Sequence, residues 1–426
     1  MLDRMMRLFK RLLSHRNPLR LLWHKIKVLT AALRYAFPAR GLTVIGITGT
    51  DGKTTTVGMV AHILHTSGLR VGALSTAFFL IDDELAWNAT QKTSPSPFTI
   101  QKFLRNCKNS GCTHVVLEYS SHGLVQGRTL FTWPQVAAIT NTSPEHLDYH
   151  RTMEQYRTDK GILFRMLKGK GTKVLNGKDE AYAQYCALPS AHTIAYGTPD
   201  GLYATDIVAE ATGTRATVHR GGETAPLHLP IPGTFNIENA LCAIGCAMAV
   251  TIPLAQATTA LSSFPGIPGR MERINEGQNF HVFIDFTVTP ASYARTLGTL
   301  ADTAKHMNVR LLVLMGSCGD RMKEKRPDIG RIASTYADTI VVTNEDPYTE
   351  DPEKIIDDVL ATIEPAKAHR IVDRAEAIRW IFDEAKPGDI VILCGKGSDT
   401  TMWTAKGRVP WNEREIARTI LREKRV

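Results

Sequence analysis

The sequence is poor in cysteine and has no long hydrophobic run, and each shortage excludes a class of protein. Its seven cysteines form no CxxC pair, so neither a disulfide framework nor a four-cysteine zinc site is expected. No apolar run approaches the ~18 residues that span a bilayer, and no signal-peptide core is visible. The 426 residues, 43% of them hydrophobic, predict a cytoplasmic enzyme of several domains.

An excess of charge of one sign is also missing, except at the N-terminus. Residues 1–40 contain ten Lys or Arg and one acid, Asp3, while the remaining 41 basic and 41 acidic residues balance. This balance gives no reason to expect nucleic-acid binding. The basic segment itself predicts two helices, one from Leu2 to Ser14 and one from the N-cap Asn17 to near Pro38.

The second of these helices carries apolar residues at helical spacing, with basic residues around them. Three interpretations are open: the stripe packs on the body of the protein, lies on an anionic membrane surface, or contacts a partner. We expect packing for the second helix and membrane contact for the first. The stripe consists of Leu19, Leu22, Trp23, Ile26, Leu29 or Thr30, Leu33 and Phe37.

From residue 42 the chain alternates predicted strands and helices, which indicates an α/β fold with a parallel sheet covered on both faces. Residues 170–232 predict a small antiparallel extension, and the Gly/Pro-rich residues 264–269 predict a hinge. We therefore predict a helical basic leader (1–40), a central P-loop-type ATPase domain (41–267) and a Rossmann-like C-terminal domain (268–426). Strands are expected near Thr43–Thr48, His114–Glu118, Val136–Thr140, His281–Asp285, Arg310–Met315, Thr339–Thr343 and Asp389–Cys394.

One stretch indicates nucleotide binding, because a predicted strand runs into a glycine-rich turn and then into Lys53-Thr54 at the head of a helix. Glycines let backbone N–H groups surround phosphate oxygens, and the helix N-terminus adds partial positive charge. Lys53 can reach the β/γ-phosphates, and the Thr54 hydroxyl can bind Mg²⁺. The leading glycine is Gly46, one residue earlier than in Walker A, and an ordinary strand–turn–helix corner is the alternative. The predicted loop consists of Gly49, Thr50, Asp51, Gly52, Lys53, Thr54 and Thr55.

Two more polar clusters follow predicted strands. Glu118 ends one strand, and a carboxylate at the carboxyl end of a parallel strand beside a phosphate loop is placed to bind the nucleotide's Mg²⁺. The run from Asn141 to His150 follows the next strand. His146 and His150 have no glutamate between them and lie in a proline-containing loop, which excludes a zincin site.

Together these segments resemble the Mur ligase family, and within it the UDP-N-acetylmuramoyl-tripeptide synthetases (MurE type). The resemblance covers residues 42 to about 415. The segments that carry it are Gly46–Thr55, Thr93–Pro95, Glu118–Arg128, Asn141–Lys160, Gly233–Ala240, Pro268–Arg273, Gly319–Pro327 and Gly395–Gly397.

The resemblance implies ATP-dependent amide formation in peptidoglycan precursor synthesis. A substrate carboxylate attacks the γ-phosphate to give an acyl phosphate and ADP, and the amine of a free amino acid then displaces phosphate. Lys53 would steady the transferring phosphate, Thr54 and Glu118 would hold one Mg²⁺, and His146 would hold a second. Lys160 would be carbamylated by CO₂, which requires an uncharged amine and hence a lowered pKa.

Further contacts rest on the resemblance alone. The base and ribose of ATP are expected to meet Asn236, Asn239, Arg270 and Asp285, although Asn236 could instead cap its helix. The muramoyl-dipeptide part of the acceptor is expected to meet Thr93, Ser94, Ser120, Gln126 and Arg128. The incoming amino acid is expected to meet Arg326, Asp346, Tyr348, Gly395 and Asp399.

The sequence departs from the family pattern in its C-terminal half. The family's Asp-Tyr-Ala-His-Thr-Pro is Asp285–Pro290 without the histidine, and Gly-Lys-Gly-His-Glu is Gly395–Asp399 with Ser and Asp. Where diaminopimelate-adding members have Asp-Asn-Pro-Arg, Tyr348 replaces the arginine and cannot supply its bidentate charge. Acids at 346 and 399 favour lysine or another basic amino acid, unless they are solvated loop residues.

The largest departure is at the N-terminus. MurE-type enzymes carry a UDP-binding domain of about a hundred residues, and residues 1–40 stand in its place here. Either the nucleotide sugar is held differently, or the acceptor is lipid-linked and is met at the membrane. We expect a cytoplasmic monomer with peripheral contact to the inner membrane face through residues 1–40.

Other amide ligases of the superfamily are alternatives: a folylpolyglutamate synthase, a cyanophycin-type ligase, or the Mur-like subunit of the lipid II amidating complex. The last carries a four-cysteine zinc ribbon, which this sequence lacks. A non-enzymatic nucleotide-binding scaffold is the alternative from another class, and it would release no phosphate with any acceptor.

Overall fold

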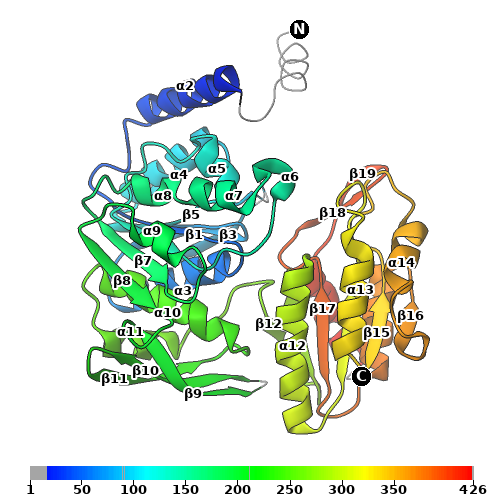
Figure 1. Ribbon diagram of the computed structural model, residues 1–426. Coiled ribbons are helices and arrows are strands. Elements are labelled where there is room, and N and C mark those ends of the chain that lie inside the picture. Colours follow the sequence, from blue (N-terminus) through cyan, green and yellow to red (C-terminus); the bar gives the residue numbers. More distant parts are fainter. Residues whose placement is uncertain (1–16, 89, 91, 211, 425–426) are drawn as a thin grey trace. The chain divides into compact units, whose positions relative to one another are not determined.

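The computed structural model describes residues 17–424 apart from 89, 91 and 211 (Figure 1). It has an α/β fold in two compact units. The first unit contains most of the chain up to Phe264, and the second contains the chain from Pro265 onward together with residues 207–215 and 229–237. Among the described residues no helix is both long and apolar enough to cross a bilayer. The helix predicted from Leu2 to Ser14 lies outside the described residues.

The first unit is built on an eight-stranded sheet in the order β4-β3-β2-β5-β1-β6-β7-β8. β1 (Thr43–Thr48) pairs in parallel with β5 (His114–Glu118) on one side and β6 (Val136–Ile139) on the other. β2 (Val71–Leu74) pairs in parallel with β5 on its other side, and β3 (Phe78–Ile81) and β4 (Glu84–Trp87) add an antiparallel edge. Because the strand order reverses at β1, the carboxyl ends of the three central strands meet where ligands bind in such sheets.

The expectation of an antiparallel extension over residues 170–232 is wrong for its first half. β7 (Thr172–Asn176) and β8 (His192–Tyr196) instead extend the large sheet in parallel with β6. β7 is buried on both faces, as parallel strands between helix layers usually are. Only β9 (Tyr203–Glu210), β10 (Gly213–Arg220) and β11 (Glu223–Leu229) form a separate three-stranded sheet.

The helices of the first unit follow the predicted pattern after β1. α4 begins at Pro97, where Ser96 accepts a hydrogen bond from the backbone N–H of Thr99 and so caps the helix. The others with their bounds are α3 (Lys53–Thr66), α5 (Ser121–Val125), α6 (Leu147–His150), α7 (Met153–Lys160), α8 (Ile162–Arg165), α9 (Tyr182–Cys186), α10 (Phe235–Met248) and α11 (Leu254–Leu261).

α2 (Pro18–Arg34) is the second predicted N-terminal helix. It begins at the N-cap Asn17 as predicted, and it ends before Pro38 because Ala36 and Phe37 have positive φ angles. It packs on α4 through a face different from the predicted one. The buried residues are Val28, Ala31 and Ala32.

The apolar stripe predicted to pack on the body therefore does not do so along α2, and that expectation is wrong. Two faces of this helix carry apolar residues at helical spacing. The face with Ala31 and Ala32 has the smaller side chains, so it can approach α4 more closely. Large side chains of the stripe are exposed: Leu19, Leu22, Trp23, Ile26, Leu29 and Leu33.

The second unit contains a six-stranded sheet in the order β12-β13-β17-β14-β15-β16. β13 (His281–Asp285), β17 (Ile390–Cys394), β14 (Leu311–Met315) and β15 (Thr339–Val342) pair in parallel, which confirms the four predicted strands. The remaining strands are β12 (Glu272–Ile274), β16 (Ala368–Arg370), β18 (Thr401–Thr404) and β19 (Gly407–Pro410).

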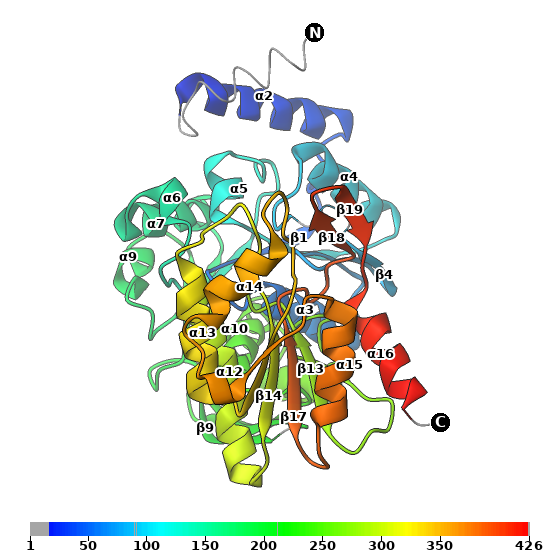
Figure 2. The same ribbon diagram turned by 90° about the vertical axis from the view of Figure 1, so that its right-hand side faces the viewer.

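Helices cover both faces of this sheet (Figure 2). α12 (Pro290–Met307), α13 (Lys325–Tyr336) and α14 (Pro352–Leu360) pack into one hydrophobic cluster with one face, and α15 (Arg374–Glu384) and α16 (Glu413–Glu423) into another with the opposite face. The central strands β14 and β17 are thus buried along their whole length, which explains their continuous hydrophobic runs.

Candidate active site

The turn after β1 has the geometry of a phosphate-binding loop. Gly49 and Gly52 have φ angles of 148° and 76°, and a side chain at Gly49 would overlap the hydroxyl of Thr140. Gly52 is the N-cap of α3 and has no side chain to accept from the first-turn N–H groups. These donors and the positive helix end are therefore available to an anion in the turn.

The segment after β6 holds this turn in shape. The backbone N–H of Thr50 donates to the carbonyl of Asn141 at 2.8 Å, and that of Asp51 donates to Asn141 Oδ1 at 3.0 Å. The Thr140 hydroxyl donates to the carbonyl of Asp51 at 2.6 Å, and the N–H of Ser143 donates to Thr50 Oγ1 at 3.0 Å. The Asn141 motif thus positions the loop that the sequence predicted for phosphate.

Glu118 meets Thr54, as the sequence predicted. Thr54 Oγ1 donates to Glu118 Oε2 at 3.0 Å, and both side chains are buried. Thr76, which follows β2 and belongs to none of the motifs, donates to the same carboxylate from its N–H at 2.7 Å and its hydroxyl at 3.1 Å. Its hydroxyl also lies 2.9 Å from that of Thr93. Carboxylate and hydroxyl oxygens suit Mg²⁺, which usually completes its shell with water and phosphate.

Two lysines converge on the same turn. Lys53 Nζ donates to the carbonyl of Thr50 at 2.7 Å, and Lys160 Nζ donates to that of Gly49 at 2.5 Å. Lys160 is buried and lies over the ring of Tyr156 at 4.3 Å. Burial, followed by the charge of Lys53, holds the pKa of Lys160 well below its usual value.

His146 lies in a cluster of rings at the start of α6. Its φ is 55°, its ring centroid is 4.8 Å from that of His122, and its Nε2 is 3.6 Å from Glu145. Among residues 17–424, with the gaps noted above, no three His, Cys, Asp or Glu side chains are arranged to hold a metal ion. A metal bound near Thr54 and Glu118 would therefore need ligands from ATP or water.

A buried chain of hydrogen bonds runs from α5 to α7. His150 Nδ1 lies 2.6 Å from Asp159 Oδ2, and its Nε2 lies 2.9 Å from Ser121 Oγ. Gln155 Nε2 donates to Asp159 Oδ1 at 2.9 Å. Asp159 directly precedes Lys160, so this chain fixes the helix that carries the lysine. Neither Ser121 nor Asp159 had a role predicted from the sequence, although both lie within motifs that carry the family resemblance.

The residues predicted for the acceptor are hydrogen-bonded to one another. The N–H of Ser120 donates to Ser94 Oγ at 3.0 Å, and the Arg128 guanidinium donates to the carbonyl of Ser94 at 2.7 Å. The same guanidinium donates to Gln126 Oε1 at 2.9 and 2.6 Å. Thr93 contacts Thr76, which donates to Glu118, so these groups form one polar surface beside that carboxylate. Thr93, Ser120 and Arg128 are partly exposed on it, whereas Ser94 and Gln126 are buried.

The residues predicted for the nucleoside have different surroundings. Asn239, on α10, lies against the turn, because a side chain at Gly52 would overlap its amide. A cleft of 370 Å³ beside the turn is lined in part by Asn141, Asn176 and Glu238.

Asn236 precedes Asn239 by one turn of α10. Its side-chain amide donates to the carbonyl of Pro232 at 2.7 Å, a bond that ties the start of α10 to the preceding chain but is not an N-cap, because a capping side chain accepts from a backbone N–H.

Arg270 and Asp285 belong to the second unit. The Arg270 guanidinium lies over the ring of Phe286 at 4.4 Å. Asp285 ends β13, and its carboxylate accepts from the N–H of Met271 at 2.7 Å and from the hydroxyl of Thr287. The two residues are thus held at the same end of this sheet, near the carboxyl ends of its parallel strands.

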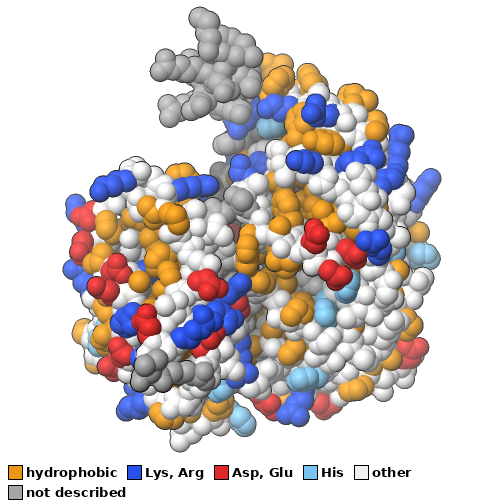
Figure 3. Space-filling view, turned by 180° about the vertical axis from the view of Figure 1, so that it is seen from behind, with side chains coloured by type: hydrophobic (Ala, Val, Ile, Leu, Met, Phe, Trp, Pro, Cys, Tyr) orange, Lys and Arg blue, Asp and Glu red, His pale blue; other side chains and the backbone are white. Residues whose placement is uncertain are grey.

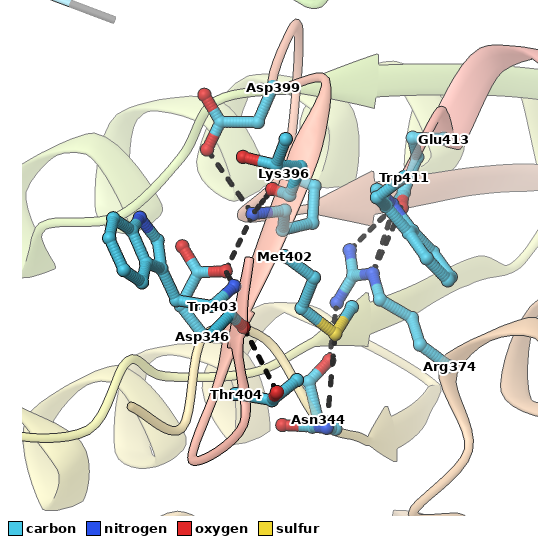
Figure 4. Close-up of polar contacts among 12 residues, drawn as sticks. Asn344, Asp346, Arg374, Lys396, Asp399, Met402, Trp403, Thr404, Trp411 and Glu413 are labelled. Atoms are coloured by element: carbon cyan, nitrogen blue, oxygen red, sulfur yellow. Dashed lines mark hydrogen bonds and ion pairs between the residues drawn. The ribbon is translucent and has the colours of Figure 1, made fainter. Parts of the chain in front are cut away.

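A buried lysine occupies the centre of the second polar cluster (Figure 4). Lys396 donates to Asp346 at 2.8 Å, to Asp399 at 3.2 Å and to the carbonyl of Thr401 at 2.9 Å. Burial alone would lower the pKa of Lys396, but the two carboxylates raise it above its usual value. The acids predicted to meet a substrate amine thus already meet an ammonium of the chain.

Tyr348, at the position of the family's arginine, belongs to a stack of four side chains. Its ring is stacked on Trp403 of β18 at 5.5 Å and 22°. Arg321 lies over Tyr348 at 4.9 Å, and Arg408 lies over Trp403 at 4.4 Å. The backbone N–H of Trp403 also donates to Asp346 Oδ1 at 2.8 Å (Figure 4). The hairpin β18–β19 is therefore tied to the predicted amino-acid site.

Arg326, predicted for the α-carboxylate, is buried and paired within the chain. It donates to Glu350 at 3.1 Å and to Asp358 at 2.9 Å. The guanidinium lowers the pKa of Glu350 to about 2. Gly395 has a φ of 107°, and a side chain there would overlap the carboxylate of Glu345. The predicted C-terminal residues thus gather at the carboxyl ends of β14, β15 and β17.

Two family models match the chain. The Mur ligase middle domain matches residues 47–247, and the Mur ligase glutamate ligase domain matches residues 269–397. Two similar curated proteins are UDP-N-acetylmuramoyl-L-alanyl-D-glutamate--2,6-diaminopimelate ligases. The protein from Bacillus licheniformis is 35% identical over 91% of this chain and 80% of its own length, and that from Thermosynechococcus vestitus is 37% identical over 92% and 80%.

Comparison with solved structures also finds Mur ligases. A UDP-N-acetylmuramoyl-L-alanyl-D-glutamate--2,6-diaminopimelate ligase superposes with a TM-score of 0.65 at 28% identity, covering 90% of this chain and 79% of that one. The folylpolyglutamate synthase of Mycobacterium tuberculosis, at 16% identity, shares the fold with a TM-score of 0.71, covering 87% and 92%. From the two domain matches and relatives of this similarity, the chain belongs to the Mur ligase family of ATP-dependent, amide-bond-forming ligases.

Proposed function

We propose that this chain adds a diamino acid to a muramoyl-dipeptide by way of an acyl phosphate. The observation that carries the proposal is the contact between Thr54 and Glu118 at the mouth of the phosphate-binding turn. It brings a hydroxyl and a carboxylate to the place where Mg²⁺ meets a nucleotide phosphate in P-loop enzymes. The polar surface made by Ser94, Ser120 and Arg128 lies beside this contact and suits an acceptor carboxylate.

In this proposal Lys53 neutralises the transferring phosphate, and Thr54 and Glu118 hold the first Mg²⁺. His146 and a carbamylated Lys160 would hold a second Mg²⁺. The electrostatic reason is that an ammonium at position 160, next to Lys53, would repel a metal ion, whereas a carbamate supplies negative charge at the same place. The lowered pKa of Lys160 favours the uncharged amine that reacts with CO₂.

The remaining predicted roles also belong to the proposal. Asn236, Asn239, Arg270 and Asp285 bind the nucleoside, and Thr93 and Gln126 complete the acceptor surface. The amino acid is held by Arg326, Asp346, Tyr348, Gly395 and Asp399. Since Tyr348 offers no charge for a distal carboxylate, lysine is preferred to diaminopimelate, the amino acid named in the relatives. We further propose that the enzyme acts as a monomer at the cytoplasmic face of the membrane.

Phosphate release tests this proposal directly. The full chain is incubated with ATP, Mg²⁺ and UDP- or lipid-linked muramoyl-dipeptide, each with lysine, diaminopimelate or ornithine. We expect release that needs acceptor and amino acid together and is fastest with lysine. E118Q should reduce it strongly at the Mg²⁺ concentration that saturates the wild type, whereas E84Q, at an exposed glutamate of β4, should not. Absence of release with every pair would support the scaffold alternative.

A further inference from the structure

We propose that the outward face of α2 is a docking surface for an anionic phospholipid bilayer. This surface, called the outer face of α2, consists of Leu19, Leu22, Trp23, Ile26, Leu29 and Leu33. The proposal specifies the peripheral location given above and rests on it, but it does not depend on the ligase reaction.

The first observation is the exposure of this face. Its members are between 39% (Trp23) and 61% (Leu19) exposed. They recur every three or four residues, so they form one stripe along a helix about 25 Å long. Figure 3 shows hydrophobic side chains gathered over α2 with Lys and Arg beside them. A contiguous apolar stripe of this size is a mark of an interaction surface.

The second observation is that α2 is already anchored by its opposite face. Val28, Ala31 and Ala32 are buried where α2 packs on α4, and Arg105 of α4 donates to the carbonyl of the C-cap residue Tyr35 at 3.0 Å. The chain after α2 is held as well, because Phe37 packs on Trp133 at 5.9 Å. Because the opposite face of α2 is already packed and the chain after the helix is held, the outer face of α2 remains exposed to solvent.

The third observation is charge. At 100° per residue, Lys25 lies on one side of the outer face, and Arg20, Lys27 and Arg34 lie on the other. Residues 18–34 contain no acid. An apolar stripe with basic residues on both sides is the arrangement of helices that lie in the plane of an anionic membrane. Trp23, under Lys27 at 5.1 Å, has the amphipathic ring that is favoured at the headgroup level.

The same charges argue against a second copy as the occupant. Two outer faces packed on each other would bring rows of Lys and Arg together without any acid to neutralise them. A bilayer with anionic headgroups supplies both the apolar layer and the opposite charge. Membrane attachment of this kind would hold the catalytic unit at the surface where a lipid-linked acceptor is found.

Vesicle sedimentation with the full chain tests the proposal. We expect sedimentation with phosphatidylcholine vesicles that contain phosphatidylglycerol, weak sedimentation with pure phosphatidylcholine, and weakening at high salt. The double variant L22D/I26D should lose binding by roughly tenfold or more. The matched control is L85D/V409D, which places the same two charges at exposed apolar residues of β4 and β19. K25E/K27E should weaken binding to the anionic vesicles, and K305E on α12 should not.

Several outcomes would overturn the proposal. One is a wild-type protein that stays in the supernatant with both vesicle types. Another is L22D/I26D binding as well as wild type, which would assign lipid binding to another part of the chain. A third is a wild-type dimer in sedimentation velocity that L22D/I26D converts to a monomer. Thermal unfolding of each variant separates loss of binding from loss of fold, and phosphate release in the absence of vesicles tests the ligase proposal separately.

Discussion

Lys160 Nζ lies 2.5 Å from the carbonyl oxygen of Gly49, inside the turn that precedes α3. A side chain from α7 thus reaches the backbone of the phosphate loop across 111 residues of sequence. Because this lysine is buried and near Lys53, its protonation state is coupled to the charge of anything bound in the turn.

Activity should depend on CO₂ if Lys160 is carbamylated. Depletion of CO₂ should lower phosphate release, and added bicarbonate should restore it, because the carbamate supplies the charge that positions the second metal. K160R keeps a positive charge at every pH and should lose roughly 10²- to 10³-fold in kcat without rescue by bicarbonate. Equal activity of the wild type with and without CO₂ would contradict carbamylation.

The buried Lys160 amine should also make stability depend on pH. Its folded-state pKa is lowered, so the unfolded chain binds more protons at every pH between that value and about 10.4. Stability from this group therefore rises as pH increases through that window. K160M should remove the dependence, so its thermal midpoint should exceed that of the wild type most at the low end of the range. Scanning calorimetry from pH 6 to 9 in CO₂-free buffer measures this difference.

Glu118 should act through its charge rather than through its shape. E118Q can still accept from the Thr54 hydroxyl and the Thr76 backbone N–H on its one oxygen, whereas its NH₂ group can only donate to the Thr76 hydroxyl, and it loses the anionic oxygen that Mg²⁺ prefers. We expect the Mg²⁺ concentration needed for half-maximal phosphate release to rise at least roughly tenfold and the thermal midpoint to stay close to that of the wild type. A Mg²⁺ titration of phosphate release measures the first quantity.

His150 should position the helix that carries Lys160. H150A leaves Asp159 and Ser121 buried without their partner, which should cost about 1–3 kcal/mol of stability. If Lys160 is no longer held in position, kcat should fall more than KM rises. H150N can keep one of the two hydrogen bonds, so it should recover part of the lost stability and part of the lost kcat. The control is H65A at a half-exposed histidine of α3. A variant with normal kcat at permissive temperature would limit His150 to a structural role.

Tyr348 should decide which diamino acid is accepted. Y348R restores the arginine of diaminopimelate-adding members, and a guanidinium pairing with a distal carboxylate adds about 1.5–3 kcal/mol. The ratio of kcat/KM for diaminopimelate to that for lysine should therefore rise at least roughly tenfold. Y336R, at an exposed tyrosine of α13, should leave the ratio unchanged.

A buried ion pair beside the second cluster should matter for stability (Figure 4). Arg374 donates to Glu413 at 2.9 Å and to the carbonyl of Cys394 at 2.7 Å, and both side chains are fully buried. R374A leaves the buried Glu413 carboxylate without a cation, with the Trp411 indole N–H still donating to it, and should cost about 3–5 kcal/mol. R379A on the same helix breaks an exposed pair with Glu423 and should cost no more than about 1 kcal/mol. Urea unfolding compares the two.

Much of the fold could be predicted from the sequence, because the patterns that indicate its strands, turns and helices are local. The strand before the loop, the glycine turn and the helix after it follow from apolar runs and from residues that permit positive φ, and β1, β5 and β13 have the predicted bounds. The convergence of Glu118 on Thr54 was also predicted, since parallel neighbours bring their carboxyl ends together. Thr76 was missed because it belongs to no motif, and only the pairing of β2 with β5 places it against Glu118.

By itself the sequence determined the family, the phosphate loop and the concentration of positive charge at the N-terminus, because each depends on residue identity and spacing along the chain. Tertiary structure decided which face of α2 is buried, that Lys160 is desolvated, and that Asp346 and Asp399 pair with Lys396. The physical reason is that burial and partner choice arise from contacts between segments distant in sequence. The spacing of apolar residues can identify an amphipathic helix, but packing against other segments decides which of its faces is buried.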